Sequence, residues 1–397
     1  MKDMQIKSIR HISELQDKKV LLRVDFNVPL KAGKVKEDYK ITRGLATIRY
    51  LLRYKCKIAI ATHLGDPGGK RDPKLSVKPA AARLHKLLGV KVVFSPDITG
   101  PKVVTAIDKI KADEVLFLEN LRFDKGERAN DYIFAKKLAQ PFDLCVNDAF
   151  AESHRECASV SAINNYLPSY AGLLLEDEVE KLSKLLRPKR PFVAVIGGAK
   201  VGTKLPLLLS MVKRADHILV GGAIANDFLK GLGYEVGRSV VGKDDLALVK
   251  AVKIYKKAGN KKIILPEDFL TSDRPSGGEV RIKGINRIEK NDYIFDIGPR
   301  SINLFAKYIK QAETIVWNGP MGLFENENFK HGTVAIARLI AARSTGRAYG
   351  VVGGGETVEA LQLTKMLHFV DWVSTGGGAM LDFLAGEPMP GLKRIVK

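Results

Sequence analysis

The chain has 397 residues, of which 45% are hydrophobic and 27% charged, with 36 glycines and only 17 prolines. This balance can bury the cores of about two ordinary domains, and it excludes a small disulfide-stapled module, a collagen-like repeat and a disordered chain. Sixty-five Lys and Arg against 44 Asp and Glu give a formal charge of +21. We therefore expect a surface that attracts polyanions, whether phosphorylated metabolites, nucleic acid or anionic lipid.

The cysteines and the first residues indicate a reducing, cytoplasmic location. Cys56, Cys145 and Cys157 are odd in number, far apart and in no C-x-x-C pair, so neither a disulfide framework nor a zinc site is indicated. Residues 1–19 contain no apolar core of signal-peptide length. No segment approaches the roughly 18 apolar residues of a membrane-spanning helix, so we expect no membrane partner.

Short apolar segments rich in β-branched residues recur along the chain, each followed by small or polar residues and a segment of helical period. This alternation is typical of βα units that feed a buried parallel sheet, and it predicts an α/β fold. Twelve strands are too many for one ordinary sheet, so we predict two sheets. The predicted strands are 20–24, 57–61, 90–94, 114–118, 143–146, 192–196, 217–220, 262–265, 293–295, 314–316, 348–352 and 369–373.

The natural division of the chain lies between the fifth and sixth predicted strands. Residues 173–186 place apolar side chains near a 3.6-residue period, which predicts one amphipathic helix. The segment 187–191, RPKRP, stops that helix before the next strand begins. A helix between two sheets is a plausible hinge.

Polar and charged residues follow the strands of the first half. Ligands of open α/β sheets bind beyond the carboxyl ends of the strands, so these positions are candidates for a site. Arginines with a histidine and an Asp/Asn pair suit a small polar anion with hydroxyl groups, although any one of them alone more often caps a turn or forms a surface ion pair. The candidates are Asp25, Asn27, His63, Asn120, Arg122, Asn147, Asp148, His154 and Arg155.

Glycines follow the strands of the second half. They allow backbone N–H groups to approach a ligand closely, and the helix N-terminus behind each favours negative charge. Lys200 and Lys204, four residues apart at a helix start, would project from one face toward such an anion. This half is predicted to bind phosphates. The glycine pairs and triplets are Gly197-Gly198, Gly221-Gly222, Gly298-Pro299, Gly319-Pro320, Gly353-Gly354-Gly355 and Gly376-Gly377-Gly378.

Several well-known motifs are missing from the sequence. There is no G-x-x-x-x-G-K-[ST], no G-x-G-x-x-G after a strand, no H-R-D with D-F-G, and no H-E-x-x-H. A Walker-type P-loop protein, a protein kinase and a nicotinamide oxidoreductase are therefore disfavoured. A divalent metal would arrive with a nucleotide and meet an acidic residue such as Glu356.

The order of the remaining motifs closely resembles the phosphoglycerate kinase family along essentially the whole chain. In the first half the matching segments are Arg23–Pro29 (RVDFNVP), His63–Gly65 (HLG), Leu118–Phe123 (LENLRF) and Asn147–Phe150 (NDAF). In the second half they are Gly197–Val201 (GGAKV), Trp317–Gly322 (WNGPMG), Gly353–Thr357 (GGGET) and Ser374–Gly378 (STGGG).

This resemblance implies an α/β protein with two Rossmann-like lobes, each a parallel sheet covered by helices, joined by a hinge helix. Residues 1–170 would bind phosphoglycerate, 171–190 would form the hinge, 191–372 would bind the nucleotide, and 373–397 would return to the first lobe. The implied reaction is reversible phosphoryl transfer from 1,3-bisphosphoglycerate to Mg-ADP, giving 3-phosphoglycerate and ATP in glycolysis and gluconeogenesis. Hinge closure would bring the two substrates into line, which suggests a monomer.

The resemblance also implies roles for single residues. Phosphoglycerate would be held by Asp25, Asn27, Lys40, His63, Arg122 and Arg155. The nucleotide would be held by Lys204, Gly221, Gly222, Gly298, Asn318, Pro320, Glu325, Gly353, Gly354, Gly355, Glu356 and Thr357. Glu325 would meet the ribose, and Glu356 would meet the Mg²⁺ that accompanies ATP or ADP. Charge on the transferring phosphoryl group would be stabilised by Lys200, Lys40, Gly354 and Gly355.

Three positions depart from the family pattern. Lys40 and Asp66 stand where arginine is usual, and Glu356 stands where aspartate is usual. Lysine keeps the charge but loses the bidentate fork of arginine, and a carboxylate at position 66 would repel the substrate phosphate unless it pairs with Lys70 or Arg71. The charge of +21, Lys40 and Asp66 motivate an alternative: a phosphoglycerate-kinase fold with weakened catalysis that binds polyanions. A solvated basic surface is the simpler interpretation of the charge.

Overall fold

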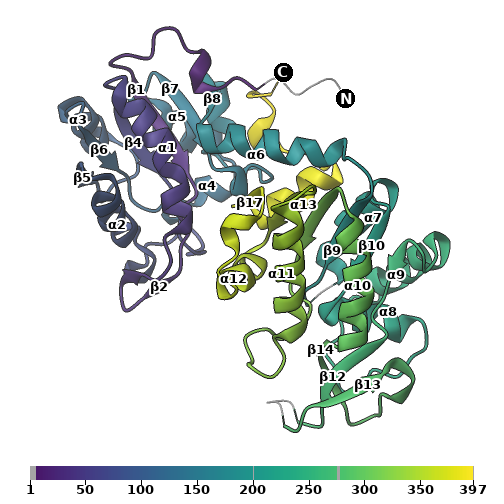
Figure 1. Cartoon of the computed structure of the whole chain (residues 1–397). Helices are drawn as coiled ribbons and strands as arrows, with labels where there is room; N and C mark the ends of the chain where they lie inside the picture. The colour runs from purple at the N-terminus through teal and green to yellow at the C-terminus, as the bar shows by residue number, and fades with distance from the viewer. Residues whose placement is uncertain (1–5, 200, 275–277, 397) are drawn as a thin grey trace. The chain divides into compact units, whose positions relative to one another are not determined.

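The computed structural model describes residues 6–199, 201–274 and 278–396. The chain divides into two compact units, Met1–Glu180 with Pro388–Lys397, and Lys181–Glu387 (Figure 1). Each unit contains its own six-stranded parallel sheet. The expected fold class, two lobes that each hold a parallel sheet covered by helices, is confirmed.

The sheet of the first unit has the strand order β5-β6-β4-β1-β7-β8. Strand β1 (KVLLRV) is buried at five of its six positions, because helices cover both faces of the sheet; its one buried charged residue, Arg23, has polar partners inside the unit. The strands are β1 (Lys19–Val24), β4 (Lys57–Ala61), β5 (Lys91–Phe94), β6 (Glu114–Phe117), β7 (Leu144–Asp148) and β8 (Ser169–Ala171), and a small hairpin pairs β2 (Leu30–Lys31) with β3 (Lys34–Val35).

Two hydrophobic cores cover the two faces of this sheet. Alternate residues of β1 enter different cores: Leu22 packs with α1 and α2, whereas Leu21 packs with α3 and α5. Helix α2 has Pro79 in its first turn and ends at Gly89, whose φ of 76° is the left-handed conformation that stops a helix. The helices are α1 (Tyr39–Arg53), α2 (Lys78–Leu88), α3 (Pro101–Lys109), α4 (Lys125–Arg128), α5 (Tyr132–Ala139) and α6 (Leu173–Ser183).

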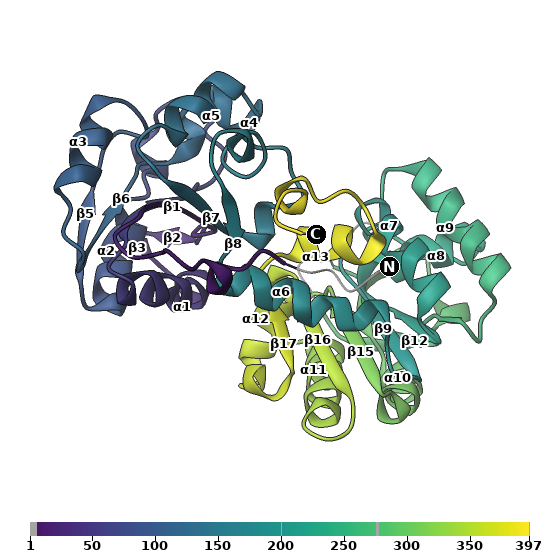
Figure 2. The same cartoon turned by 90° about the horizontal axis from the view of Figure 1, so that it is seen from above.

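The described ends of the chain meet in this first unit. Ile6 forms an antiparallel bridge with Val396, and the Lys7 N–H donates to the Ile395 carbonyl at 2.7 Å (Figure 2). The predicted helix over 173–186 is present as α6, and its last residues, Lys184–Leu186, form a 3-10 turn. The boundary between the two units falls between Glu180 and Lys181, within this helix.

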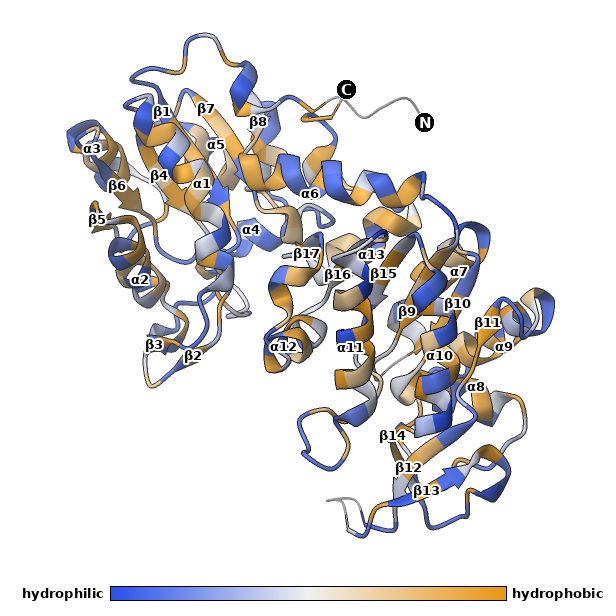
Figure 3. Ribbon diagram, in the orientation of Figure 1, coloured by the Kyte–Doolittle hydropathy of each residue, from blue (hydrophilic) through white to orange (hydrophobic). Residues whose placement is uncertain are grey.

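The parallel sheet of the second unit has the order β11-β10-β9-β15-β16-β17, which is the 3-2-1-4-5-6 order of dinucleotide-binding folds. Figure 3 shows that hydrophobic residues gather in the strands of both units. The strands are β9 (Phe192–Ile196), β10 (His217–Val220), β11 (Ile263–Ile264), β15 (Thr314–Asn318), β16 (Tyr349–Gly353) and β17 (Trp372–Ser374). The helices are α7 (Val201–Arg214), α8 (Gly222–Gly231), α9 (Asp245–Ala258), α10 (Pro299–Gln311), α11 (His331–Ser344), α12 (Gly355–Leu363) and α13 (Gly377–Ala385).

A separate three-stranded antiparallel sheet, β13-β12-β14, also belongs to the second unit. It consists of β12 (Asp268–Ser272), β13 (Arg281–Gly284) and β14 (Tyr293–Ile297). The predicted strand 293–295 is therefore present, but the expectation that it feeds a parallel sheet is wrong. Its partners were missed because they lack the apolar pattern of a buried strand: β12 (DFLTS) is buried but begins and ends with polar residues, and β13 (RIKG) is partly exposed and largely polar.

Two further sequence expectations concern cysteines and membrane spans. All three cysteines are free thiols in buried positions. In the described part of the chain, none of the helices combines the length and the hydrophobicity that a membrane-spanning segment requires.

Candidate active site

The carboxyl end of β1 begins the polar site of the first unit. Asp25 is 8% exposed, and its Oδ2 accepts a hydrogen bond from Lys40 Nζ at 2.6 Å. Burial alone would raise the pKa of Asp25, but the charge and hydrogen bond of Lys40, together with the charge of Arg23, outweigh it and lower the pKa below its ordinary value. Asp25 is therefore ionised, and it holds the Lys40 ammonium at the start of α1.

Asn27 and Arg122 both bind the backbone of one residue, Gly65. The Gly65 N–H donates to Asn27 Oδ1 at 3.1 Å, and Arg122 Nη1 donates to the Gly65 carbonyl at 2.8 Å. Asn120 fixes the turn beneath them, since its amide bonds to Leu64 and to the Arg122 N–H. The loops after β1, β4 and β6 are thus tied together, as the strand-end rule predicts.

His63 is buried and neutral. Burial and the nearby Arg23 charge hold its pKa well below the ordinary value. Arg23 Nη2 lies 3.3 Å from His63 Nδ1 and can only donate, so the ring proton is on Nε2. That Nε2 faces Glu152 Oε1 at 3.7 Å.

Glu152 also pairs with the two predicted anion-binding arginines. Arg122 Nη2 donates to Glu152 Oε2 at 2.8 Å, and Arg155 Nη1 lies 3.4 Å from Glu152 Oε1. His63, Arg122 and Arg155 are therefore brought together, around a carboxylate of the same chain. Sequence reasoning missed Glu152. It lies in a 3-10 turn after β7, three residues before Arg155, and that i, i+3 spacing was the one available signal.

The unusual Asp66 has a partner that the sequence did not predict. Its carboxylate forms an ion pair with Arg128, and that hydrogen bond lowers the pKa of Asp66. The expected pairing with Lys70 or Arg71 is wrong for Arg71, which instead pairs with Asp97 at 3.6 Å. Arg128 is distant in sequence but reaches Asp66 from the end of α4.

The other polar residues after β7 have structural partners. Asn147 Nδ2 donates to Ser153 Oγ and to the Gly391 carbonyl, both at 3.2 Å, which joins the last residues of the chain to this unit. Asp148 Oδ1 accepts from the N–H groups of Leu174 and Leu175 and caps α6.

In the second unit, the strand order changes direction between the neighbouring strands β9 and β15. The glycine-rich loops that follow these two strands lie at this point. The Gly197 N–H donates to the Asn318 carbonyl at 2.9 Å, and the Gly198 N–H donates to the Pro320 carbonyl at 2.9 Å. Gly222 closes the third side with a φ of 62°, and a Cβ there would lie 2.7 Å from the Gly198 nitrogen. No other residue allows the three loops to approach so closely.

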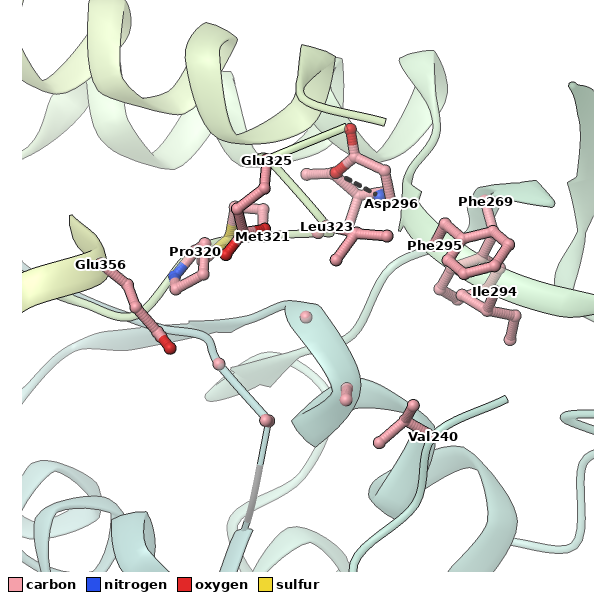
Figure 4. A pocket seen from close by; sticks show the side chains of 16 residues that line it. Val240, Phe269, Ile294, Phe295, Asp296, Pro320, Met321, Leu323, Glu325 and Glu356 are labelled. Atoms are coloured by element: carbon pink, nitrogen blue, oxygen red, sulfur yellow. Dashed lines mark hydrogen bonds between the residues drawn. The ribbon is translucent and has the colours of Figure 1, made fainter. Parts of the chain in front are cut away.

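Two cavities open at these loops. The first, of about 350 Å³, has apolar side chains at one end and Glu325 and Glu356 elsewhere on its wall (Figure 4). The apolar wall includes Val240, Phe269 of β12 and Ile294 of β14, and the part on β12 was missed together with that strand. A slot of this kind accepts a flat apolar ring, and the glycine loops beside it accept phosphates.

The second cavity, of about 440 Å³, is lined by the N-termini of α12 and α13. Asn318 Nδ2 donates to the Gly353 carbonyl at 2.7 Å, and the Gly319 N–H donates to Thr357 Oγ1 at 2.7 Å. Gly354, at a φ of 101°, lies beneath Asn318, whose Nδ2 would be 3.0 Å from a Cβ at this position. Backbone N–H groups of two helix starts therefore face one space, which favours a phosphate.

Lys204 and Glu356 carry the charges of the second cavity. Burial lowers the pKa of Lys204 to about 8, against the opposing attraction of Glu356. Glu356 is exposed and lines both cavities, so its carboxylate can reach a metal ion bound to phosphates in either. One carboxylate plus phosphate oxygens is the usual ligand set of protein-bound Mg²⁺, and the site fits that ion.

Three predicted nucleotide-binding residues, Gly221, Gly298 and Gly353, do not line either cavity. Lys200, which was predicted to be catalytic, lies outside the described residues. Gly298 caps α10 and packs against the Asp268 carboxylate, and it does not line either cavity. Gly221 is buried against Met321 behind the first cavity. Gly222, Pro320 and Glu325 line the first cavity, while Lys204, Asn318, Gly354, Gly355 and Thr357 line the second.

Comparison with known proteins decides the family. The model of the family described as "Phosphoglycerate kinase" matches residues 9–387. The chain belongs to the phosphoglycerate kinase family. It is 41% identical over 392 residues to the phosphoglycerate kinase of Pelotomaculum thermopropionicum, covering 98% of this chain and 99% of that one. The corresponding protein of Rubrobacter xylanophilus is 44% identical over 391 residues, covering 98% of each.

Solved phosphoglycerate kinase structures have the same fold. The structure from Coxiella burnetii superposes with a TM-score of 0.85 at 38% identity, covering 98% of this chain and 99% of that one. The structure from Pyrococcus horikoshii gives a TM-score of 0.85 at 33% identity and 98% coverage of both chains. The predicted family and enzyme class, a phosphotransferase, are thereby confirmed. No comparison favours the alternative of a non-catalytic polyanion-binding protein.

Proposed function

We propose that this phosphoglycerate kinase transfers a phosphoryl group reversibly between 1,3-bisphosphoglycerate and Mg-ADP, giving 3-phosphoglycerate and ATP. The observation that carries the proposal is the pairing of two unlike sites in one chain of this family. One unit gathers Lys40, His63, Arg122 and Arg155 at its strand ends, and the other presents glycine loops and helix starts beside an apolar slot.

In this proposal the first unit binds phosphoglycerate. Arg122 and Arg155 bind its phosphate or carboxylate, Asp25 and Asn27 accept from its hydroxyl groups, and Lys40 adds a positive charge near the transferring group. Lys40 is a single ammonium held by Asp25, so it supplies charge without the two-point grip of a guanidinium group.

The second unit binds the nucleotide. The base occupies the slot near Phe269 and Ile294, Glu325 meets the ribose, and the phosphates lie against the loops of Gly354 and Gly355. Lys200 and Lys204 stabilise negative charge on the phosphoryl group during transfer. Mg²⁺, when bound with the nucleotide, neutralises phosphate charge, and Glu356 would hold it.

Phosphoryl transfer requires positioning and charge stabilisation rather than a nucleophile from the protein. Because the two substrates bind to different units, we propose that closure about residues 171–190 brings them into line and excludes water, which would otherwise hydrolyse the acyl phosphate. We also propose a monomeric, cytoplasmic enzyme with residues 1–170 and 191–372 as its functional lobes. Of the segment 373–397, residues up to Glu387 belong to the second unit, and Pro388–Lys397 belong to the first.

The test is turnover of purified protein with 3-phosphoglycerate and Mg-ATP, coupled to a reporting dehydrogenase. Arg122→Ala should raise the KM for 3-phosphoglycerate, and Lys204→Ala should raise the KM for Mg-ATP, each by about tenfold or more, since each removes a charge-assisted hydrogen bond. Folded protein that binds nucleotide but shows no turnover would contradict the proposal. A salt-sensitive nucleic-acid complex in that case would favour the alternative polyanion-binding function.

A further inference from the structure

The side chain of Glu152 occupies the centre of the proposed anion site. It is 5% exposed, and its two oxygens face Arg122 Nη2 at 2.8 Å, Arg155 Nη1 at 3.4 Å and His63 Nε2 at 3.7 Å. These three groups are the ones that the strand-end pattern assigns to a bound anion. A carboxylate of the protein is thus placed where a ligand's carboxylate or phosphate would be expected.

The neighbouring cations are also paired within the protein. Lys40 binds Asp25 at 2.6 Å, and the buried Arg23 lies 3.9 Å from Glu127 Oε1. Both terminal nitrogens of Arg122 are in use, one at the Gly65 carbonyl and one at Glu152. Each terminal nitrogen carries two N–H groups, and an anion that approaches Arg122 from the side facing Glu152 competes with that carboxylate for them.

Glu152 is the acceptor that can move. Hydrogen bonds fix the backbone around it. The Glu152 N–H and the Ser153 hydroxyl both donate to the Ala149 carbonyl at 3.0 Å, and the Gly391 N–H donates to the Ser153 carbonyl. The bonds that hold its carboxylate are made by side chains alone, and Arg155 is half exposed. For an anion to reach Arg122 and Arg155 on this side, the Glu152 side chain must rotate away while its backbone stays in place.

We infer that Glu152 is an internal competitor for the anion site, and that it sets the affinity of this site for the substrate. Binding of an anion displaces its carboxylate from Arg122 and Arg155, and the cost of this exchange weakens binding. The inference rests on the proposed function only for the identity of the anion as phosphoglycerate. Glu152 is therefore a determinant of affinity that acts through the arginines and not a group that contacts the reacting atoms.

The experiment compares Glu152→Gln with Glu156→Gln, an exposed glutamate four residues away. Isothermal titration measures the dissociation constants of sodium sulfate, 3-phosphoglycerate and Mg-ATP. Glutamine has nearly the same shape as glutamate but no negative charge, so it competes less with a bound anion. Glu152→Gln should therefore bind sulfate and 3-phosphoglycerate about tenfold more tightly than the wild type, which is the effect of one charge-assisted hydrogen bond. The control should match the wild type, and Mg-ATP binding should stay unchanged in both.

Equal or weaker sulfate binding by folded Glu152→Gln would overturn the inference. The sulfate titration tests the inference about Glu152 independently of 3-phosphoglycerate. If 3-phosphoglycerate neither binds nor turns over, that result counts against the proposed function and not against the inference. A purely structural role would weaken anion binding or lower the melting temperature, and it would not tighten the complex. If Glu152→Gln does not fold, Glu152→Asp withdraws the carboxylate by one methylene and should also tighten sulfate binding, whereas no tightening would overturn the inference.

Discussion

The charge of Lys204 depends on pH within the range in which enzymes are commonly assayed. Because burial lowers its pKa to about 8, Lys204 is protonated below this pH and loses its charge above it. We expect kcat/KM for Mg-ATP, which reports the free enzyme, to fall as the pH rises through about 8. Lys204→Arg keeps its charge and should remove that fall, although the activity of the variant can be lower.

Saturation with Mg-ATP provides the matching control for Lys204. Phosphates near the ammonium group favour its charged form, so the fall in kcat should occur at a higher pH than the fall in kcat/KM. If kcat/KM for Mg-ATP falls at the same pH in the wild type and in Lys204→Arg, the titration belongs to another group.

At the same scale, the sequence predicted single site residues but not their partners. Asp25, His63 and Arg122 follow strands, and strand ends of a parallel sheet meet at one edge. The contacts of Glu152 and Arg128 depend on how short turns fold back over that edge, and no periodicity of the sequence encodes this. Residues that complete an ion pair across a distance of 62 positions, as Arg128 does for Asp66, are found only in the folded chain.

Among the elements, α6 is held at its N-terminus by a buried carboxylate. Asp148 accepts from Leu174 and Leu175, yet burial raises its pKa from 3.8 to about 6. A raised folded-state pKa means that the folded protein binds the proton more tightly than the unfolded chain does. The stability gained from this proton binding is fully present below about pH 4 and is lost as the pH rises through about 6. Asp148→Asn keeps an oxygen acceptor and cannot ionise.

We therefore expect Asp148→Asn to gain stability relative to the wild type by about 1–3 kcal/mol between pH 4 and pH 8, because the pKa of Asp148 rises from 3.8 to about 6 on folding. Urea unfolding at a series of pH values measures the difference. Asp131→Asn is the control, because Asp131 caps α5 from a partly exposed position. Parallel stability curves for wild type and Asp148→Asn would refute the prediction.

The elements themselves were predicted unevenly, for reasons of burial. The buried strands β1, β4 and β9 are continuous apolar segments because helices cover both faces of their sheets. Of the antiparallel strands, β12 is fully buried but contains only two apolar residues, and β13 is partly exposed, so few of its residues need to be apolar. Phe269 of β12, which belongs to the apolar wall of the first cavity, was missed with that strand.

At the scale of the whole molecule, the formal charge of +21 should act on encounter with anionic substrates. Long-range attraction raises association rates and is screened over about 10 Å at 0.1 M salt. We expect kcat/KM for 3-phosphoglycerate and for Mg-ATP to fall severalfold between about 20 and 200 mM salt, with kcat at saturation nearly constant.

Potassium chloride and potassium acetate at equal ionic strength distinguish screening of the positive charge from occupation of an anion site. Screening depends only on ionic strength, whereas occupation of an anion site depends on the ion. A kcat/KM that is independent of salt would mean that the positive charges are spread evenly and only keep the protein in solution.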